Sequence, residues 1–410
     1  MADSRTHHLD GGVPVIVHTE PGRRMTGLAL AVGFGARHDP HDAGGMAHLL
    51  EHLVMSAPLA GGASLSRRIE QLGGVSNATT GPESLVVHAH VLTEDAERVA
   101  DWICRAVLCP EITTAVLDRE RRVVLQELAA AAADPWDAVQ DAFLAALFAG
   151  HPLGRPVGGL EASLNATGVD HLADVHRAAL SAPVTFASAG GLADAQITAA
   201  LVRGGLGALP MGAVASEADD GPRVAPPVGT PSWPDGFGWL IAGSRGPAAT
   251  DPRRAAFQVL GHLLGASPAS LMYARLRDDH GLAYNFRAWS RSYRDAGAWR
   301  FQAGVDTGNG PRVVEQLGEC LGAVAADGPP ADAHAAAVRQ AVMGLVLECE
   351  SPLDHAVAAA SEHCLTGQTW NVDAEVSRLD RVQPAEVAAA AGEVLESLIV
   401  VTRPLPGADQ

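Results

Sequence analysis

Hydrophobic and polar positions recur along the first half of the chain with the two periods that mark strands and helices. Apolar runs of strand length, several of them alternating, predict strands at 13–18, 26–33, 75–79, 84–91 and 184–189. Apolar positions spaced three and four apart predict helices at 44–53, 64–72, 94–108, 113–133, 137–148, 170–180 and 194–206. The order of these elements predicts a sheet with helices packed on it.

A similar order of elements returns after residue 235. Strands are expected at 237–242, 284–289, 298–305 and 398–402, and helices at 252–264, 268–279, 311–326, 331–348, 352–365 and 384–395. Between the halves, 209–235 is rich in Pro, Gly, Ser and Asp, which is typical of a linker. We therefore predict an α+β protein of two homologous halves, 1–208 and 236–410. Each half is expected to hold an antiparallel-rich sheet covered by helices on one side.

The helix expected at 44–53 carries three residues that suit a metal. At about 100° per residue, His52 lies about 40° from His48, and Glu51 lies about 60° to the other side. His-x-x-Glu-His inverts the zinc-protease signature His-Glu-x-x-His, in which two neutral imidazoles bind zinc and the carboxylate is a general base. The rest of the segment is apolar nearly all round, so it should be buried. Buried imidazoles need partners, and this requirement favours a metal over an ordinary polar face.

A catalytic zinc keeps three protein ligands, so a third is needed from elsewhere in the chain. Glu120 and Glu127, on the helix expected at 113–133, are seven residues apart and return to within about 20° on one face. One of these carboxylates can bind the metal while the other bonds a ligating imidazole. The sequence alone leaves open which does which.

Charge and composition exclude several classes of protein. The net charge is −18, which argues against a nucleic-acid partner and favours cationic or neutral peptides at long range. We find no apolar run of about 18 residues and no N-terminal signal segment, and the five cysteines are scattered. We therefore expect a cytoplasmic protein that neither spans a membrane nor binds nucleic acid.

Several segments, taken in order, resemble the insulinase/pitrilysin family of zinc metallopeptidases, the inverzincins. The likeness is nearest to the branch of mitochondrial processing peptidase and its small bacterial relatives. It is carried by 8–17, 33–37, 44–52, 73–79, 120–127 and 150–156. The resemblance implies one Zn²⁺ per chain held by His48, His52 and Glu127, with Glu51 as the base. It also implies that Glu120 orients a ligand and that Asn77 lies on a substrate-binding edge strand.

The same resemblance implies a role for a segment of the second half. By its own pattern, 268–279 is a helix ended by a glycine cap at Gly281 and followed by a strand. In the family, an Arg and a Tyr at this spacing reach the zinc site and hold the substrate carbonyl. Arg277 and Tyr284 match those positions.

The function implied is a zinc metalloendopeptidase that hydrolyses short or unfolded peptides, such as leader peptides or presequences. Because both halves of the machinery are in one chain, we expect a homodimer with two composite sites. Two alternatives remain. The chain is one subunit of a heterodimeric leader peptidase, or it is a non-catalytic binding or scaffold member of the family.

Overall fold

The computed structural model describes residues 3–212, 232–233, 236–265, 267–279, 281–283, 285–306 and 308–405. Their contacts divide them into two units. Unit 1 comprises the described parts of 1–129, 155–218 and 347–371, and unit 2 those of 130–154, 219–346 and 372–410. Each unit thus combines segments that are distant in sequence. The predicted domains, 1–208 and 236–410, are continuous and stay a prediction, and most of the predicted linker lies outside the described residues.

Unit 1 is built on a six-stranded sheet with the order β1-β2-β6-β3-β5-β4. All neighbouring strands are antiparallel except β2 and β6, which are parallel. The strands are β1 (Asp3–His8), β2 (Pro14–Thr19), β3 (Met25–Val32), β4 (Val75–Thr80), β5 (Leu85–Leu92) and β6 (Val184–Gly190). β4 and β1 are therefore the two edges, and β4 leaves one side of its backbone unpaired within the sheet.

The helices of unit 1 lie on both faces of this sheet. Leu28, Leu30 and Val32 of β3 join a core with α1 and α3, while the opposite face of β3 packs against α13. At Gly27 a Cβ would lie 2.4 Å from the carbonyl oxygen of Pro352, so only glycine lets α13 approach this closely. The helices are α1 (Met46–Ser56), α2 (Leu65–Gln71), α3 (Thr93–Leu108), α6 (Glu161–Ala166), α7 (Val169–Leu180), α8 (Asp194–Arg203) and α13 (Pro352–Thr366). The helix α4 (Thr114–Ala133) begins in unit 1, and its last residues belong to unit 2.

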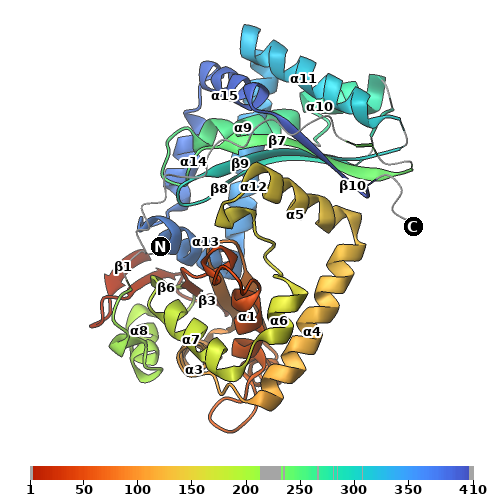
Figure 1. The fold of residues 1–410 in the computed structure, drawn as a ribbon. Helices are drawn as coiled ribbons and strands as arrows, with labels where there is room; N and C mark the ends of the chain where they lie inside the picture. The colour runs from red at the N-terminus through yellow and green to blue at the C-terminus, as the bar shows by residue number, and fades with distance from the viewer. Residues whose placement is uncertain are drawn as a thin grey trace. The chain divides into compact units, whose positions relative to one another are not determined.

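Unit 2 is built on a four-stranded antiparallel sheet with the order β10-β7-β9-β8. Its strands are β7 (Gly238–Gly246), β8 (Phe286–Ser292), β9 (Gly297–Val305) and β10 (Ile399–Arg403). The helices α9, α11 and α15 cover one face, and α5 packs on the other (Figure 1). The helical segments are α5 (Pro135–Leu147), α9 (Arg254–Leu264), α10 (Leu271–Tyr273), η4 (Ala274–Asp279), α11 (Gly310–Asp327), α14 (Val372–Asp380) and α15 (Pro384–Glu396). The helix α12 (Ala331–Glu350) begins in unit 2, and its last residues belong to unit 1.

The α+β class predicted from the sequence is confirmed, as are the predicted strands and the longer helices, within a few residues at their ends. Among the described strands and α-helices, three were not predicted: β1, α6 and α14. The helix expected at 268–279 is a single α-turn, α10, followed by a π-helical segment, η4. α13 and α5 also place helices on the second face of each sheet, beyond the one covered side that the sequence predicts.

Candidate metal centre

The start of α1 is fixed by a buried carboxylate. Gly45 precedes the helix with φ 99°, and its amide donates to Asp39 at 2.6 Å. The amides of Met46 and Ala47 donate to the same carboxylate at 3.2 and 2.8 Å. Burial raises the pKa of Asp39 to about 6, although these amides lower it. Asp39 thus bonds amides that a helix start would otherwise leave unsatisfied, a role that sequence reasoning missed.

The backbone at Gly159 packs closely against the start of α1. Gly159 has φ +90°, and a Cβ there would lie 2.2 Å from the Cα of Gly45. The amide of Leu160 donates to the carbonyl of Gly44 at 3.3 Å. The backbones at Gly45 and Gly159 are therefore in contact where α1 begins, and there is no room for a side chain at position 159.

Three predicted metal ligands converge beside this helix start. His48 Nε2 lies 3.4 Å from Glu127 Oε2, and His52 Nε2 lies 3.2 Å from the same oxygen. One donor atom from each of the three residues lies within 4.8 Å of the other two. Burial, followed by the charge of His52, lowers the pKa of His48, so its imidazole is neutral at pH 7, the form that binds a metal. All three side chains belong to unit 1.

These donors fit zinc. Tetrahedral ligands at about 2.0–2.1 Å from Zn²⁺ lie roughly 3.3 Å from one another, and the two donor distances to Glu127 match that edge. Two imidazoles and one carboxylate are also a donor set found in catalytic zinc sites, where the fourth position stays open. The carboxylate of Glu127 is half exposed, so solvent and substrate can reach this point.

Glu120 lies behind His52, away from the metal-binding nitrogens. Its carboxylate oxygen Oε2 is 3.5 Å from His52 Nδ1, and its Oε1 accepts from Arg119 Nε at 2.7 Å. The side chain of Glu120 is buried. The structure thus separates the two carboxylates that the sequence left interchangeable: Glu127 approaches the Nε2 atoms, and Glu120 approaches the opposite edge of one ring.

Glu51, the predicted base, receives a hydrogen bond from the sheet. The hydroxyl of Thr80, at the end of β4, donates to Glu51 Oε2 at 2.6 Å. Thr80 Oγ1 also lies 3.4 Å from the carbonyl oxygen of Ala47. Sequence reasoning missed Thr80, because nothing local relates it to a residue 29 positions earlier. The alternation of side chains along β4 is the signal that the sequence offers for Thr80. Thr80 and the buried Ala78 are two residues apart, so both point to the side of the strand that faces α1.

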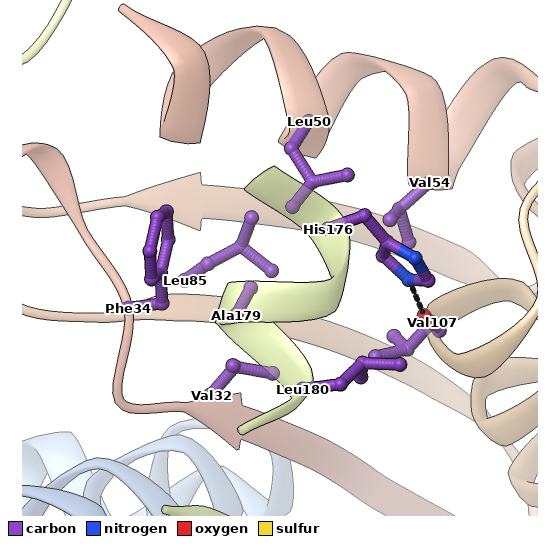
Figure 2. Close-up of a pocket in the computed structure, with 9 residues that line it drawn as sticks. All are labelled: Val32, Phe34, Leu50, Val54, Leu85, Val107, His176, Ala179 and Leu180. Carbon is purple, nitrogen blue, oxygen red and sulfur yellow. Dashed lines mark hydrogen bonds between the residues drawn. The ribbon is translucent and has the colours of Figure 1, made fainter. Parts of the chain in front are cut away.

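The opposite face of α1 is packed. Leu50 and Val54 line a small apolar cavity of about 10 Å³ together with residues of α7, β3 and β5 (Figure 2). The one polar lining side chain, His176, is bonded through Nε2 to the carbonyl of Val107 at 2.8 Å. The cavity is small and its lining is almost wholly apolar, so it offers a water few polar partners.

Asn77, predicted to bind substrate, lies on edge strand β4. It pairs with His88 across the β4–β5 ladder, so its side chain is exposed on the sheet face opposite Thr80. The structure therefore does not bring the side chain of Asn77 into the group around Glu51. The part of Asn77 in substrate binding stays a prediction.

Of the two residues predicted from the second half, Arg277 is among the described residues. Arg277 lies in η4 of unit 2, where its Nη1 donates to the hydroxyl of Tyr273 at 2.6 Å and its guanidinium lies 5.1 Å from that ring. Tyr284 lies outside the described residues. The predicted cap is present, since Gly281 has φ +61°. The roles of Arg277 and Tyr284 stay predictions.

None of the helices in the described part of the chain combines the length and the hydropathy needed to cross a bilayer.

Comparison with known proteins identifies the family. A family model described as insulinase (peptidase family M16) matches residues 14–160, and a model described as peptidase M16 inactive domain matches 234–341. An uncharacterised zinc protease of Mycobacterium leprae is 29% identical over 400 residues, covering 94% of this chain and 88% of the relative. An uncharacterised zinc protease of Streptomyces coelicolor is 28% identical over 397 residues, covering 94% of this chain and 86% of the relative.

Solved structures share the fold. The peptidase M16 inactive domain from Pseudomonas fluorescens superimposes with a TM-score of 0.83 at 15% identity, covering 98% of each chain. A chain of complex III2 from Candida albicans gives 0.79 at 15% identity, covering 97% of this chain and 95% of its own. The predicted family and fold class are both confirmed. The chain belongs to the insulinase family of peptidases, family M16.

Proposed function

We propose that this protein is a zinc-dependent endopeptidase that cleaves short or unfolded peptides. One observation carries the proposal: the Nε2 atoms of His48 and His52 lie 3.4 and 3.2 Å from one carboxylate oxygen of Glu127, the spacing of tetrahedral zinc ligands. The names of the relatives, which are zinc proteases, agree with it.

When bound, zinc supplies a water of lowered pKa and polarises the scissile carbonyl. Glu51 would act as the general base, accepting on a carboxylate oxygen the proton that the attacking water gives up. Thr80 donates to Glu51 Oε2 and holds the carboxylate in one orientation, so the other oxygen remains for the proton. Glu120 keeps the ring of His52 oriented through Nδ1.

The substrate is proposed to bind as an extended strand. β4 is the edge of its sheet, and Thr80 at its end bonds the base. A peptide added to this edge would receive backbone hydrogen bonds without selection by side chains, which suits unfolded segments, leader peptides and presequences. In a folded protein most backbone groups are already paired, so few segments are free to add to this edge.

The test compares Glu51→Gln with Glu70→Gln, an exposed glutamate of α2 in the same unit. Each purified full-length protein is assayed for bound zinc by mass spectrometry and for cleavage of an unstructured peptide. Glu51→Gln is expected to keep one zinc per chain and lose cleavage, whereas Glu70→Gln keeps both. Cleavage by Glu51→Gln at the wild-type rate would refute the proposed base. Wild-type protein that binds no zinc when supplied with it would refute the metal site.

For assembly, we propose a homodimer in which Arg277 and Tyr284 of one copy serve the metal centre of the other. Support comes only from the sequence, which places both residue sets in one chain. Light scattering of the protein purified alone gives the mass. A monomer that gains activity only with a dissimilar subunit would favour the heterodimeric alternative. Zinc binding without cleavage in any assembly would favour a scaffold.

A further inference from the structure

Three arginines gather on one face of the β8–β9 hairpin in unit 2. The register pairs Arg287 with Gln302, Trp289 with Arg300, and Arg291 with Ala298. Residues paired directly across an antiparallel ladder share a face, so the three arginines stand on the same side of the hairpin. On this side, the helix α5 contributes Trp136 and Gln140.

Arg300 is a buried cation whose hydrogen-bond partners are all neutral. It is 6% exposed, and it donates to the Tyr293 hydroxyl at 2.9 Å and to Gln140 Oε1 at 3.2 Å. Its Nε is buried without a partner. Burial lowers the pKa of Arg300, the positive charges of Arg291 and Arg287 lower it further, and Tyr293 raises it.

Arg287 is held in position by two indoles. Its guanidinium lies 4.6 Å from the ring centre of Trp136 and 4.1 Å from that of Trp289. One amino group donates to Gln302 Oε1 at 3.3 Å. The Nε2 of Gln302 is itself buried without a partner. The cation is therefore preorganised by aromatic faces, while the side chain as a whole is exposed.

The charge balance of this face is unusual. Within the described part of the chain, no carboxylate lies within 4 Å of Arg287, Arg291 or Arg300, although the chain carries a net charge of −18. The acidic residue of the hairpin turn, Asp295, acts on Arg245 instead. Buried cations in proteins are normally paired, because an uncompensated charge in the interior is strongly unfavourable. An external anion would supply the missing charge.

We propose that Arg287, Arg291 and Arg300 form an anion site that binds a carboxylate of an acidic peptide. A guanidinium fork matches the two oxygens of a carboxylate, and the indoles beside it offer apolar surface for the rest of the peptide. A polyanion such as nucleic acid would be repelled by the negative chain at longer range. The choice of a peptide as the ligand rests on the proposed function.

The site predicts a preference opposite to that expected from net charge. The overall charge favours cationic or neutral peptides, whereas these arginines favour an acidic one. Two peptides of ten residues, both unstructured and amidated at the C-terminus, separate the two effects: one carries two Glu residues, and the other has Gln in their place. Binding is measured by calorimetry on full-length zinc-loaded protein carrying Glu51→Gln, so that the peptide is not consumed.

The Glu peptide is expected to bind at least tenfold more tightly than the Gln peptide, with an affinity that falls as salt rises. The double variant Arg287→Gln/Arg291→Gln should lose that preference. Arg253→Gln, which removes a charge already paired with Asp251 and Glu393 in the same unit, should keep it. Equal binding of the two peptides, or a preference that survives the double variant, would overturn the proposal. The proposal would also be overturned if calorimetry shows binding of inorganic phosphate but of neither peptide.

Failure of the proposed function would look different. Cleavage is measured separately with the wild-type protein and mass spectrometry. A chain that binds the Glu peptide selectively but never cleaves any peptide would contradict the peptidase proposal and leave the anion site standing. A chain that cleaves peptides but binds the Glu and Gln peptides equally would support the peptidase proposal and contradict the anion site.

Discussion

Replacing Gly159 by alanine tests how tightly the start of the metal-binding helix is held. Gly159 has φ +90°, where an L side chain costs about 1–2 kcal/mol. The new Cβ would also lie 2.2 Å from the Cα of Gly45, whereas ordinary contact begins at 3.4 Å. The two backbones must therefore separate by about 1 Å, and such overpacking costs a further 1–3 kcal/mol or so. The sum is a loss of about 2–5 kcal/mol in the free energy of unfolding.

Gly22 provides the matched control. It has the same φ of +90°, but a Cβ there would meet nothing within 4 Å. Gly22→Ala should therefore show only the cost of the backbone conformation, about 1–2 kcal/mol. Urea unfolding followed by circular dichroism gives both values. Because α1 starts beside Gly45, Gly159→Ala should also weaken zinc binding, and Gly22→Ala should not.

The reasoning fails if the two variants unfold at the same urea concentration with the same slope. It also fails if Gly159→Ala loses stability but binds zinc with unchanged affinity, since the displaced backbone would then not reach His48.

Three further predictions concern single side chains. Glu120→Gln should lower zinc affinity about 10–100-fold, because His52 loses the carboxylate beside Nδ1; competition with a chelator measures this, and unchanged affinity would reject the contact. Thr80→Val should lower kcat with zinc retained and KM little changed, because Glu51 loses its donor, while Thr80→Ser restores turnover; a serine variant as slow as valine would contradict the role of the hydroxyl. Burial, followed by the charge of His18, lowers the pKa of His355 to about 4, below the unfolded value near 6.5, so its contribution to stability is lost as pH falls from 6.5 to 4. His355→Phe keeps an aromatic ring and should weaken that acid dependence by about 2 kcal/mol, a figure reduced because the side chain is partly exposed. Thermal unfolding of both proteins at several pH values would contradict this if the two curves stay parallel.

The local sequence pattern predicted the strands and helices whose apolar residues recur at a regular spacing. α1 and β5 have apolar residues at the spacing of their own period, and both are present as expected. β1 was missed because its residues, Asp3–His8, are all polar. It is a strand because it pairs with β2, and it shows no hydrophobic alternation. α6 has only 6 residues, too few for a period to show.

The metal ligands could be predicted because helix geometry relates them. His48 and His52 are one turn apart, and Glu120 and Glu127 are two turns apart, so each pair shares a face in any α-helix. Asp39 and Thr80 could not be predicted in the same way. Their contacts with α1 depend on how a loop and a strand fold back onto the helix, and no spacing encodes this.

The place of α13 has a consequence for biosynthesis. This helix, residues 352–366, comes near the end of the chain yet covers the face of β3 where Gly27 touches Pro352. A nascent chain therefore cannot cover that face of the sheet until the ribosome has passed that segment. Until then a strand face rich in glycine and alanine stays bare, and chaperones that hold apolar strands would have their longest opportunity to act during this interval.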